Sequence, residues 1–327
     1  MQNIKLLTTA DIKDFISMEE AINVMKLAFK NLSLGKYQMP VRTITDFGDA
    51  GLSLFYKPSF MPSEDMIGIK LLSQSKGKPS SANPAIQGIM ILINSETNSV
   101  VGLLDGTYLT ALRTGAASGI ATRLLSRKES SVLALFGAGA QGYKQFEAVC
   151  CERNIKRAYI YDINSQAVER FIDFYKPETG VELVHASDLS YLKEADIICT
   201  ATPSGKPLFP LNMLKKGVHI NAIGSYSPKM QELPDGLFLT ASLFVDHKDS
   251  CFAESGDIIN PMSKGTFKSE NYKGEIGELI SAKITGRMTP DEITVFKSVG
   301  VAIQDLAIAS FAYTKACQAD KGQNIKI

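Results

Sequence analysis

Lys70 stands in the middle of an apolar, strand-like stretch, MIGIKLLSQSKG, which runs from Met66 to Gly77. Because side chains alternate between the two faces of a strand, Lys70 shares its face with Gly68 and Leu72, while aliphatic residues occupy the other face. A lysine in an edge strand commonly faces water and protects that edge from pairing with another chain. Lys70 could instead point into a partly closed space, where it would keep its charge only beside an anion.

A glycine motif with GxGxxG spacing lies in the sequence SVLALFGAGAQG. Gly137 would allow the tight turn, Gly139 would let a pyrophosphate approach the backbone, and Gly142 would let helix and strand pack closely. The motif follows an apolar strand and precedes a helical segment, whose N-terminal N–H groups would face the phosphates. This context predicts a dinucleotide site.

Asp162 ends the next apolar run, RAYIYD, twenty residues after Gly142. A carboxylate at this place can accept hydrogen bonds from the 2′- and 3′-hydroxyls of an adenosine ribose, whereas a 2′-phosphate would meet a like charge. The sequence therefore predicts NAD(H) in preference to NADP(H).

Composition indicates a globular protein of two domains. The chain has 327 residues, of which 45% are hydrophobic, and this length exceeds one ordinary core. Its 35 basic and 34 acidic residues give a net charge of +1, and Lys and Arg are not concentrated in any segment. We therefore expect no nucleic-acid partner.

Five cysteines without CxxC spacing argue against a disulfide framework and against a zinc site, and they fit a reduced, cytoplasmic setting. His185, His219 and His247 show neither metal-ligand spacing nor a paired nucleophile, so we expect them to be structural and no metal to be bound. The first residues lack an apolar run of signal-peptide length, and no eighteen apolar residues follow one another. We expect a protein that is neither exported nor membrane-spanning.

The sequence predicts the secondary-structure elements that would position these residues, and their type changes along the chain. Ser17 and Glu20 form a capping box before an amphipathic helical pattern that ends at Gly35. From Val41 to Gly102, short β-rich runs alternate with turn clusters, which predicts a largely antiparallel sheet. Residues 107–125 predict a long helix rich in small side chains.

After this helix, apolar runs of strand length alternate with helical segments, which predicts a parallel, doubly wound sheet. The last forty residues run from a β-like segment, EITVFKS, into an apolar helix, and we expect this tail to return to the N-terminal part. The fold class is therefore α/β: a Rossmann NAD-binding domain of residues 116–299 beside a split β-rich domain of residues 1–115 with 300–327.

The motifs ALRTGAASG, FGAGAQG, INAIG and GEIGELI, behind a β-rich N-terminal part, resemble the ornithine cyclodeaminase and mu-crystallin family. The resemblance extends from PVRT near residue 40 to KSVGVAIQD near residue 305 and is much more specific than the glycine motif alone. It implies a homodimer whose N-terminal domains, completed by the C-terminal helix, pair across a two-fold axis and bind the substrate. It also implies NAD(P)-dependent chemistry at the Cα–N bond of an amino or imino acid.

The resemblance assigns the substrate-binding arginine of the family to Arg42, the active-site lysine to Lys70, and a second arginine near substrate and cofactor to Arg113. Each arginine could also be an ordinary surface charge. Three cations around one pocket suit a carboxylate-bearing substrate, because a guanidinium can hold both oxygens and a lysine supplies a charge and a movable proton.

Further positions match cofactor contacts of the family, although each alone could be a capping or turn residue. Beside the glycines and Asp162 they are Thr114, Ala140, Gln141, Thr202, Ile223, Gly224, Ser225 and Ser298.

Tyr226 marks a departure from the ornithine cyclodeaminases, which the resemblance expects to carry an aspartate at this substrate-binding position in INAIGSYSP. A tyrosine, with a reference pKa of about 10, is a poor base near neutral pH, and cyclodeamination needs several proton transfers. Glu232 could serve as a substitute base, although its place six residues downstream favours a solvent-facing or turn-capping role.

We therefore expect an enzyme that moves hydride between a nicotinamide and the C=N carbon of a small imino acid, with Lys70 as proton source. Reduction of a cyclic ketimine such as Δ1-pyrroline-2-carboxylate to L-proline needs only one hydride and one proton. An alanine-type amino-acid dehydrogenase, an ornithine cyclodeaminase and a non-enzymatic, crystallin-like NAD(P)H-binding protein are the alternatives. The three cations argue against the last.

Overall fold

The computed structural model describes residues 3–40, 42–75 and 86–326. The chain divides into two compact units, which we call the β-rich unit (Met1–Arg113 with Val301–Ile327) and the Rossmann unit (Thr114–Gly300). Val41, the start of the expected antiparallel region, and Lys76 and Gly77, the end of the stretch around Lys70, lie outside the described residues.

The β-rich unit contains a seven-stranded sheet in the order β15-β1-β6-β5-β4-β3-β2. The strands from β2 to β6 pair antiparallel with their neighbours, as expected, whereas β1 pairs parallel with β6. The strands are β1 (Asn3–Leu7), β2 (Thr43–Phe47), β3 (Leu52–Met61), β4 (Met66–Ser75), β5 (Ile86–Asn94), β6 (Ser99–Asp105) and β15 (Gln323–Lys326).

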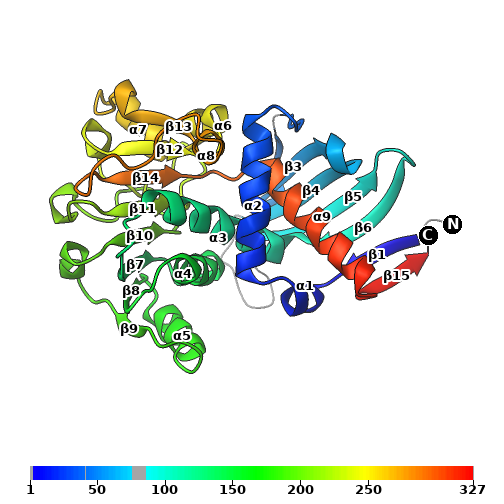
Figure 1. Ribbon diagram of the computed structural model, residues 1–327, viewed down its shortest axis with the longest axis horizontal. Coiled ribbons are helices and arrows are strands. Elements are labelled where there is room, and N and C mark those ends of the chain that lie inside the picture. The colour runs from blue at the N-terminus through cyan, green and yellow to red at the C-terminus, as the bar shows by residue number, and fades with distance from the viewer. Residues whose placement is uncertain (1–2, 41, 76–85, 327) are drawn as a thin grey trace. The chain divides into compact units, whose positions relative to one another are not determined.

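Helix α9 (Ala302–Gln318) packs on β3, β4 and β5, and α2 (Met18–Ser33) lies beside α9 (Figure 1). The capping box predicted at the start of α2 is present, because Ser17 accepts from the backbone of Glu20 and the Glu20 carboxylate accepts from the backbone of Ser17. Gly35, with φ of 67°, follows the end of this helix. The shorter α1 (Thr9–Phe15) precedes α2.

Strand β4 is central in the sheet, so Lys70 does not lie on an edge strand. Met66, Gly68 and Lys70 are buried on the face that α9 covers. A Cβ atom on Gly68 would lie 2.7 Å from the Leu306 side chain of α9, so this glycine lets the helix approach closely. The alternation of the strand therefore carries Lys70 into the helix–sheet interface.

The opposite face of the same strands carries apolar side chains that stay partly exposed. The strand register places them side by side, for example Ile69 opposite Ile91. They are Tyr56, Pro58, Phe60, Ile67, Ile69, Leu71, Ile89, Ile91, Ile93 and Leu103, which we call the open face.

The Rossmann unit contains an eight-stranded sheet in the order β13-β12-β14-β11-β10-β7-β8-β9, with parallel neighbours throughout, which confirms the expected doubly wound sheet. The strand order reverses at β7 and β10, where such sheets bind ligands beyond the carboxyl ends of the strands. The strands are β7 (Val132–Phe136), β8 (Arg157–Tyr161), β9 (Glu182–His185), β10 (Ile197–Thr200), β11 (His219–Ala222), β12 (Ser242–Val245), β13 (Tyr272–Glu275) and β14 (Thr294–Lys297).

The α-helices between β6 and β14 include the long helix expected over residues 107–125. They are α3 (Gly106–Leu125), α4 (Ala140–Glu152), α5 (Ser165–Tyr175), α6 (Lys248–Glu254), α7 (Gly256–Ser263) and α8 (Ile276–Ile280).

The β-like segment EITVFKS contains β14, which lies between β11 and β12 in the parallel sheet and whose residues are all buried. The segment is therefore part of the Rossmann unit, and it is the helix after it, α9, that packs on the β-rich sheet. A strand with parallel neighbours on both sides needs such burial. The chain enters the β-rich unit only after Gly300, whose φ of 77° permits the change of direction.

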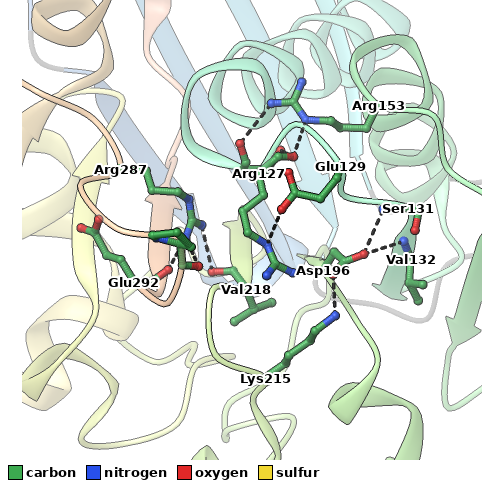
Figure 2. A network of polar contacts seen from close by, with 12 residues as sticks. Arg127, Glu129, Ser131, Val132, Arg153, Asp196, Lys215, Val218, Arg287 and Glu292 are labelled. Carbon is green, nitrogen blue, oxygen red and sulfur yellow. Dashed lines mark hydrogen bonds and ion pairs between the residues drawn. The ribbon is translucent and has the colours of Figure 1, made fainter.

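A polar network fixes the carboxyl end of α3 at the edge of the Rossmann sheet where β7 begins (Figure 2). The Asp196 carboxylate accepts hydrogen bonds from Arg127, Lys215 and the backbone of Ser131 and Val132. The Arg153 guanidinium donates to several of the last carbonyl groups of α3. Positive charge near a helix C-terminus is stabilising. The network lies where β7 begins, whereas the glycine motif follows the end of β7, at the opposite edge of the sheet.

Candidate functional site

The glycine motif forms the turn from β7 into α4. Gly137 has a φ of 101°, and a Cβ atom there would lie 2.6 Å from the carbonyl oxygen of Ala201, in the loop after β10. A Cβ atom on Gly142 would collide with the carbonyl oxygen of Gly137. Gly139 and Ala140 are exposed, and a Cβ atom on Gly139 would meet no described atom within 4 Å. The turn thus requires glycine at two positions and leaves open space at the third, which fits an approaching pyrophosphate.

Asp162 lies at the carboxyl end of β8, beside this turn. Its Oδ2 atom accepts a hydrogen bond of 2.8 Å from the backbone N–H of Ala138, and Oδ1 accepts one of 2.9 Å from Asn164. The side chain is partly exposed. A carboxylate held in this way has lone pairs left for ribose hydroxyls.

The other expected cofactor contacts of the Rossmann unit lie mostly at the same edge, after β10, β11 and β14. Thr202 is partly exposed, whereas Ile223, Gly224 and Ser225 are buried. The Ser225 hydroxyl donates to the carbonyl oxygen of Met230 at 2.7 Å.

The Ser298 hydroxyl donates to Asp246 Oδ2 at 2.6 Å, so the remaining hydrogen-bonding capacity of this side chain is acceptor only. Thr114 is buried on α3, and Gln141 is partly buried in the first turn of α4. Tyr226 packs, half-buried, against the hydrophobic core of the Rossmann unit.

In the β-rich unit, Lys70 has a buried ion pair. Its Nζ atom lies 2.7 Å from Asp305 Oδ2 and donates to the Thr110 hydroxyl at 3.2 Å. Only 2% of the Lys70 surface is exposed. An isolated ammonium could not stay charged at such a depth, so the Asp305 carboxylate is what keeps the charge there.

Arg113 on α3 binds the same carboxylate from the other side. Its Nε atom donates to Asp305 Oδ1 at 2.9 Å, and Nη1 donates to Gln304 Oε1 at 2.7 Å. Asp305 therefore bridges Lys70 and Arg113. Sequence reasoning missed Asp305, although a carboxylate within the apolar segment VAIQDLAIASFAY was a signal, because buried charges require partners.

Lys57 on β3 is a second residue that sequence reasoning missed. It lies directly opposite Lys70 in the antiparallel register, and it is also buried, with 6% of its surface exposed. Burial, and after it the charge of Lys70, lower the pKa of the Lys57 ammonium well below its usual value. The cluster of Lys57, Lys70, Arg113 and Asp305 thus combines three basic side chains with one carboxylate.

The charges of this cluster shift the pKa values of its members. Burial lowers the pKa of Lys70 to about 8, against the opposing effect of Asp305. Burial alone would raise the pKa of Asp305, but Lys70 and Arg113 outweigh it and lower the value to about 2. An excess of basic groups suits a carboxylate ligand, and an ammonium with a pKa of about 8 can donate a proton near neutral pH.

Arg42, the third expected cation, precedes β2. Its guanidinium carbon lies 5.9 Å from the ring centroid of Phe55 on β3, within cation–π range. The Arg42 charge is one of the causes that lower the pKa of Lys70.

The expectation that Glu232 faces solvent is wrong. Its side chain is completely buried, and it is therefore not available as a substitute base either. Its carboxylate accepts from the backbone of Thr202 and Gly224 and from the hydroxyls of Thr200 and Thr202. A carboxylate that accepts four hydrogen bonds fixes the position of its donors, which here belong to β10 and to the loops after β10 and β11.

The histidines have local contacts. His219 is buried between Thr294 and Asn221, and burial lowers its pKa to about 3, so it stays neutral. His247 caps α6.

Within the described ranges, His, Cys, Asp and Glu residues form no group that could hold a metal ion. The helices of the same ranges include none long and apolar enough to cross a membrane.

Comparison with known proteins gives full-length matches. The model of the Ornithine cyclodeaminase/mu-crystallin family matches residues 2–320. A Delta(1)-pyrroline-2-carboxylate reductase from Bacillus cereus is 34% identical over 316 residues, which cover 96% of this chain and 97% of the relative.

Two solved structures are similar to this chain over nearly its whole length. The Delta(1)-pyrroline-2-carboxylate reductase of Thermococcus litoralis, in complex with NADH and L-proline, is similar with a TM-score of 0.92 and 34% identity, covering 98% of this chain and 100% of that one. An archaeal alanine dehydrogenase dimer with bound NAD has a TM-score of 0.91 and 34% identity, with 100% of both chains covered.

The position of Asp162 predicts discrimination against a 2′-phosphate. We expect the dissociation constant for NADPH, measured by fluorescence titration, to exceed that for NADH at least tenfold, because the phosphate would meet the carboxylate (about 1.4 kcal/mol per tenfold). Asp162→Ser should reduce this ratio, whereas Asp173→Ser, which removes an exposed carboxylate from α5, should leave it unchanged. Tighter binding of NADPH by the unmodified protein would contradict the prediction.

Proposed function

Since the chain belongs to the Ornithine cyclodeaminase/mu-crystallin family, we propose that it is an NADH-dependent oxidoreductase that reduces the C=N bond of a small imino acid. The reaction we favour is reduction of Δ1-pyrroline-2-carboxylate to L-proline. The observation that carries the proposal is the cluster of Lys57, Lys70, Arg113 and Asp305, in which basic groups exceed carboxylates.

Several observations support this substrate class. Relatives that are 34% identical over nearly the whole chain are Delta(1)-pyrroline-2-carboxylate reductases, and one of them was solved with NADH and L-proline. The lysine and the two arginines expected at the substrate site, Lys70, Arg42 and Arg113, are all present. A substrate carboxylate would be held by the guanidinium groups and by the Lys70 ammonium.

In this proposal the glycine turn and Asp162 hold the dinucleotide, which supplies the hydride when it is bound. The β-rich unit supplies the other requirements of the reaction. The arginines neutralise the substrate carboxylate and orient the imine. Lys70, an ammonium with a pKa of about 8, donates the single proton that the nitrogen needs.

Tyr226 argues against ornithine cyclodeamination. That reaction oxidises the amino acid, expels ammonia and reduces a ring imine, so it needs a group that accepts and returns protons near neutral pH. A tyrosine is a poor base there. Glu232 is no substitute, because its carboxylate is buried and engaged by four donors.

An alanine-type dehydrogenase is the second candidate, favoured by the similarity to the archaeal alanine dehydrogenase. Both reactions use one hydride and one proton at a C=N bond and differ in the substrate side chain. A non-enzymatic NADH-binding protein is disfavoured, because such a protein would not need Arg42, Lys70 and Arg113 together.

We also propose that the protein is a homodimer that associates through the open face of the β-rich sheet. This face presents a row of aliphatic and aromatic side chains on several adjacent strands, and contiguous apolar patches of this kind mark interaction sites. The similar alanine dehydrogenase is a dimer. None of the five cysteines, all of which the structure describes, forms a disulfide, which fits a reducing compartment, and we place the protein in the cytoplasm.

The substrate proposal is tested by following NADH oxidation with Δ1-pyrroline-2-carboxylate and with pyruvate plus ammonia, and the release of proline and ammonia from L-ornithine with catalytic NAD. We expect the cyclic imine to give the highest kcat/KM and ornithine to give no proline. Lys70→Met should lower turnover about a hundredfold or more, because the proton source is lost, while NADH affinity stays the same.

Lys26→Met, which removes an exposed lysine from α2, is the matched control and should keep full activity. Unchanged turnover in Lys70→Met would refute the role of the lysine. Stoichiometric release of proline and ammonia from ornithine would refute the substrate assignment.

The dimer is tested by light scattering at micromolar concentration. We expect twice the chain mass of 35.6 kDa. Ile69→Glu, in the middle of the open face, should shift the protein to the monomer, because an unpaired carboxylate would be buried at the interface. Leu27→Glu, at an exposed position of α2, should leave the dimer intact. A monomeric unmodified protein would contradict the proposal.

A further inference from the structure

Glu232 is a buried carboxylate for which the proposed reaction has no use. It follows β11 in the loop NAIGSYSPKMQEL, and none of its surface is exposed. Burial, and after it the nearby Asp257 carboxylate, raise the pKa of Glu232. A carboxylate in such a place costs stability, so its contacts indicate what it maintains.

The two oxygens of Glu232 bind two different loops. Oε1 accepts from the backbone N–H of Thr202 at 2.7 Å and from the Thr202 hydroxyl at 2.8 Å. Oε2 accepts from the backbone N–H of Gly224 at 2.8 Å and from the Thr200 hydroxyl at 2.8 Å. One side chain therefore joins the loop after β10 to the loop after β11.

A second carboxylate fixes Glu232 itself. Asp257 Oδ1 accepts from the backbone N–H groups of Glu232 and Leu233, and Asp257 Oδ2 accepts from Lys297 Nζ at 3.1 Å. Asp257 and Lys297 are completely buried. The position of the Glu232 backbone is thus tied to β14 through Asp257 and Lys297.

The two joined loops lie where the cofactor should bind. They follow β10 and β11, on the far side of the β7/β10 switch point from Asp162, which is the side of the second mononucleotide-binding half. Gly137 of the glycine turn contacts the loop after β10 directly, since its Cβ position lies 3.3 Å from Thr202 Cγ2. The loops that Glu232 joins therefore border the nicotinamide half of the dinucleotide site.

We propose that Glu232 is a positioning residue that holds the Thr202 and Gly224 loops in the conformation that binds the nicotinamide half of NADH. The assignment rests on the proposed function for its ligand. One backbone N–H group points to each oxygen of Glu232, so both oxygens must be acceptors. An amide in the same place would turn its NH2 group toward one of these two N–H groups, and the loops would have to separate there.

The adenosine half of the site has its own support. The glycine turn is held by the hydrogen bonds from Ala138 to Asp162 and from Gly137 to the carbonyl oxygen of Tyr161, at 2.8 Å each. Glu232 takes part in neither. A positioning role at the nicotinamide half therefore predicts that loss of the carboxylate affects the two halves differently, whereas a general structural role predicts equal effects.

The test compares two probes in one variant. We expect Glu232→Gln to raise the dissociation constant for NADH at least tenfold in fluorescence titrations and to change that for ADP, measured by calorimetry, less than twofold. Glu169→Gln, at an exposed position of α5, is the matched control and should change neither. Thermal unfolding shows whether each variant is folded.

Should Glu232→Gln fail to fold, Thr200→Val carries the test, because it removes one donor and keeps the carboxylate. It should weaken NADH binding several-fold and leave ADP binding unchanged. Unchanged NADH affinity in a folded variant, or an equal loss of both ligands, would overturn the positioning role. An unmodified protein that binds ADP but not NADH would instead overturn the proposed function, and this inference with it.

Discussion

The Asp305 carboxylate holds together the part of the β-rich unit on which the proposed chemistry depends. Asp305 brings Lys70 from β4 and Arg113 from α3 to one point, through contacts of 2.7 and 2.9 Å that are almost wholly buried. Without this carboxylate, the charged forms of Lys70 and Arg113 would not be stable at that depth. Lys57, Lys70 and Arg113 outnumber the one carboxylate of this cluster, which suits the substrate carboxylate that we propose.

Carboxylates play a similar part at the binding edge of the Rossmann unit. Asp162 accepts a backbone N–H from the glycine turn, Glu232 accepts from the loops after β10 and β11, and Asp246 accepts from Val299 and Gly300 after β14. The loops after β7, β10, β11 and β14 are thus each held by a carboxylate that accepts from their backbone N–H groups. Preorganised loops lose less entropy when a ligand binds.

Local signals made much of the fold and part of the candidate site predictable. The capping box at Ser17, the strand alternation around Lys70 and the glycine turn before α4 depend on neighbouring residues, so the sequence alone indicated them. Asp305 and Glu232 were missed or misread because their partners are distant in the chain.

The central claim, that Lys70 donates the proton and Asp305 sets its proton affinity, is tested most directly by the pH dependence of kcat/KM for Δ1-pyrroline-2-carboxylate. Activity should require protonated Lys70 and fall as pH rises through about 8. Asp305→Asn removes the negative charge that raises the pKa of Lys70, so this fall should move to lower pH by about one unit or more. A fall at the same or a higher pH in the variant would contradict the account.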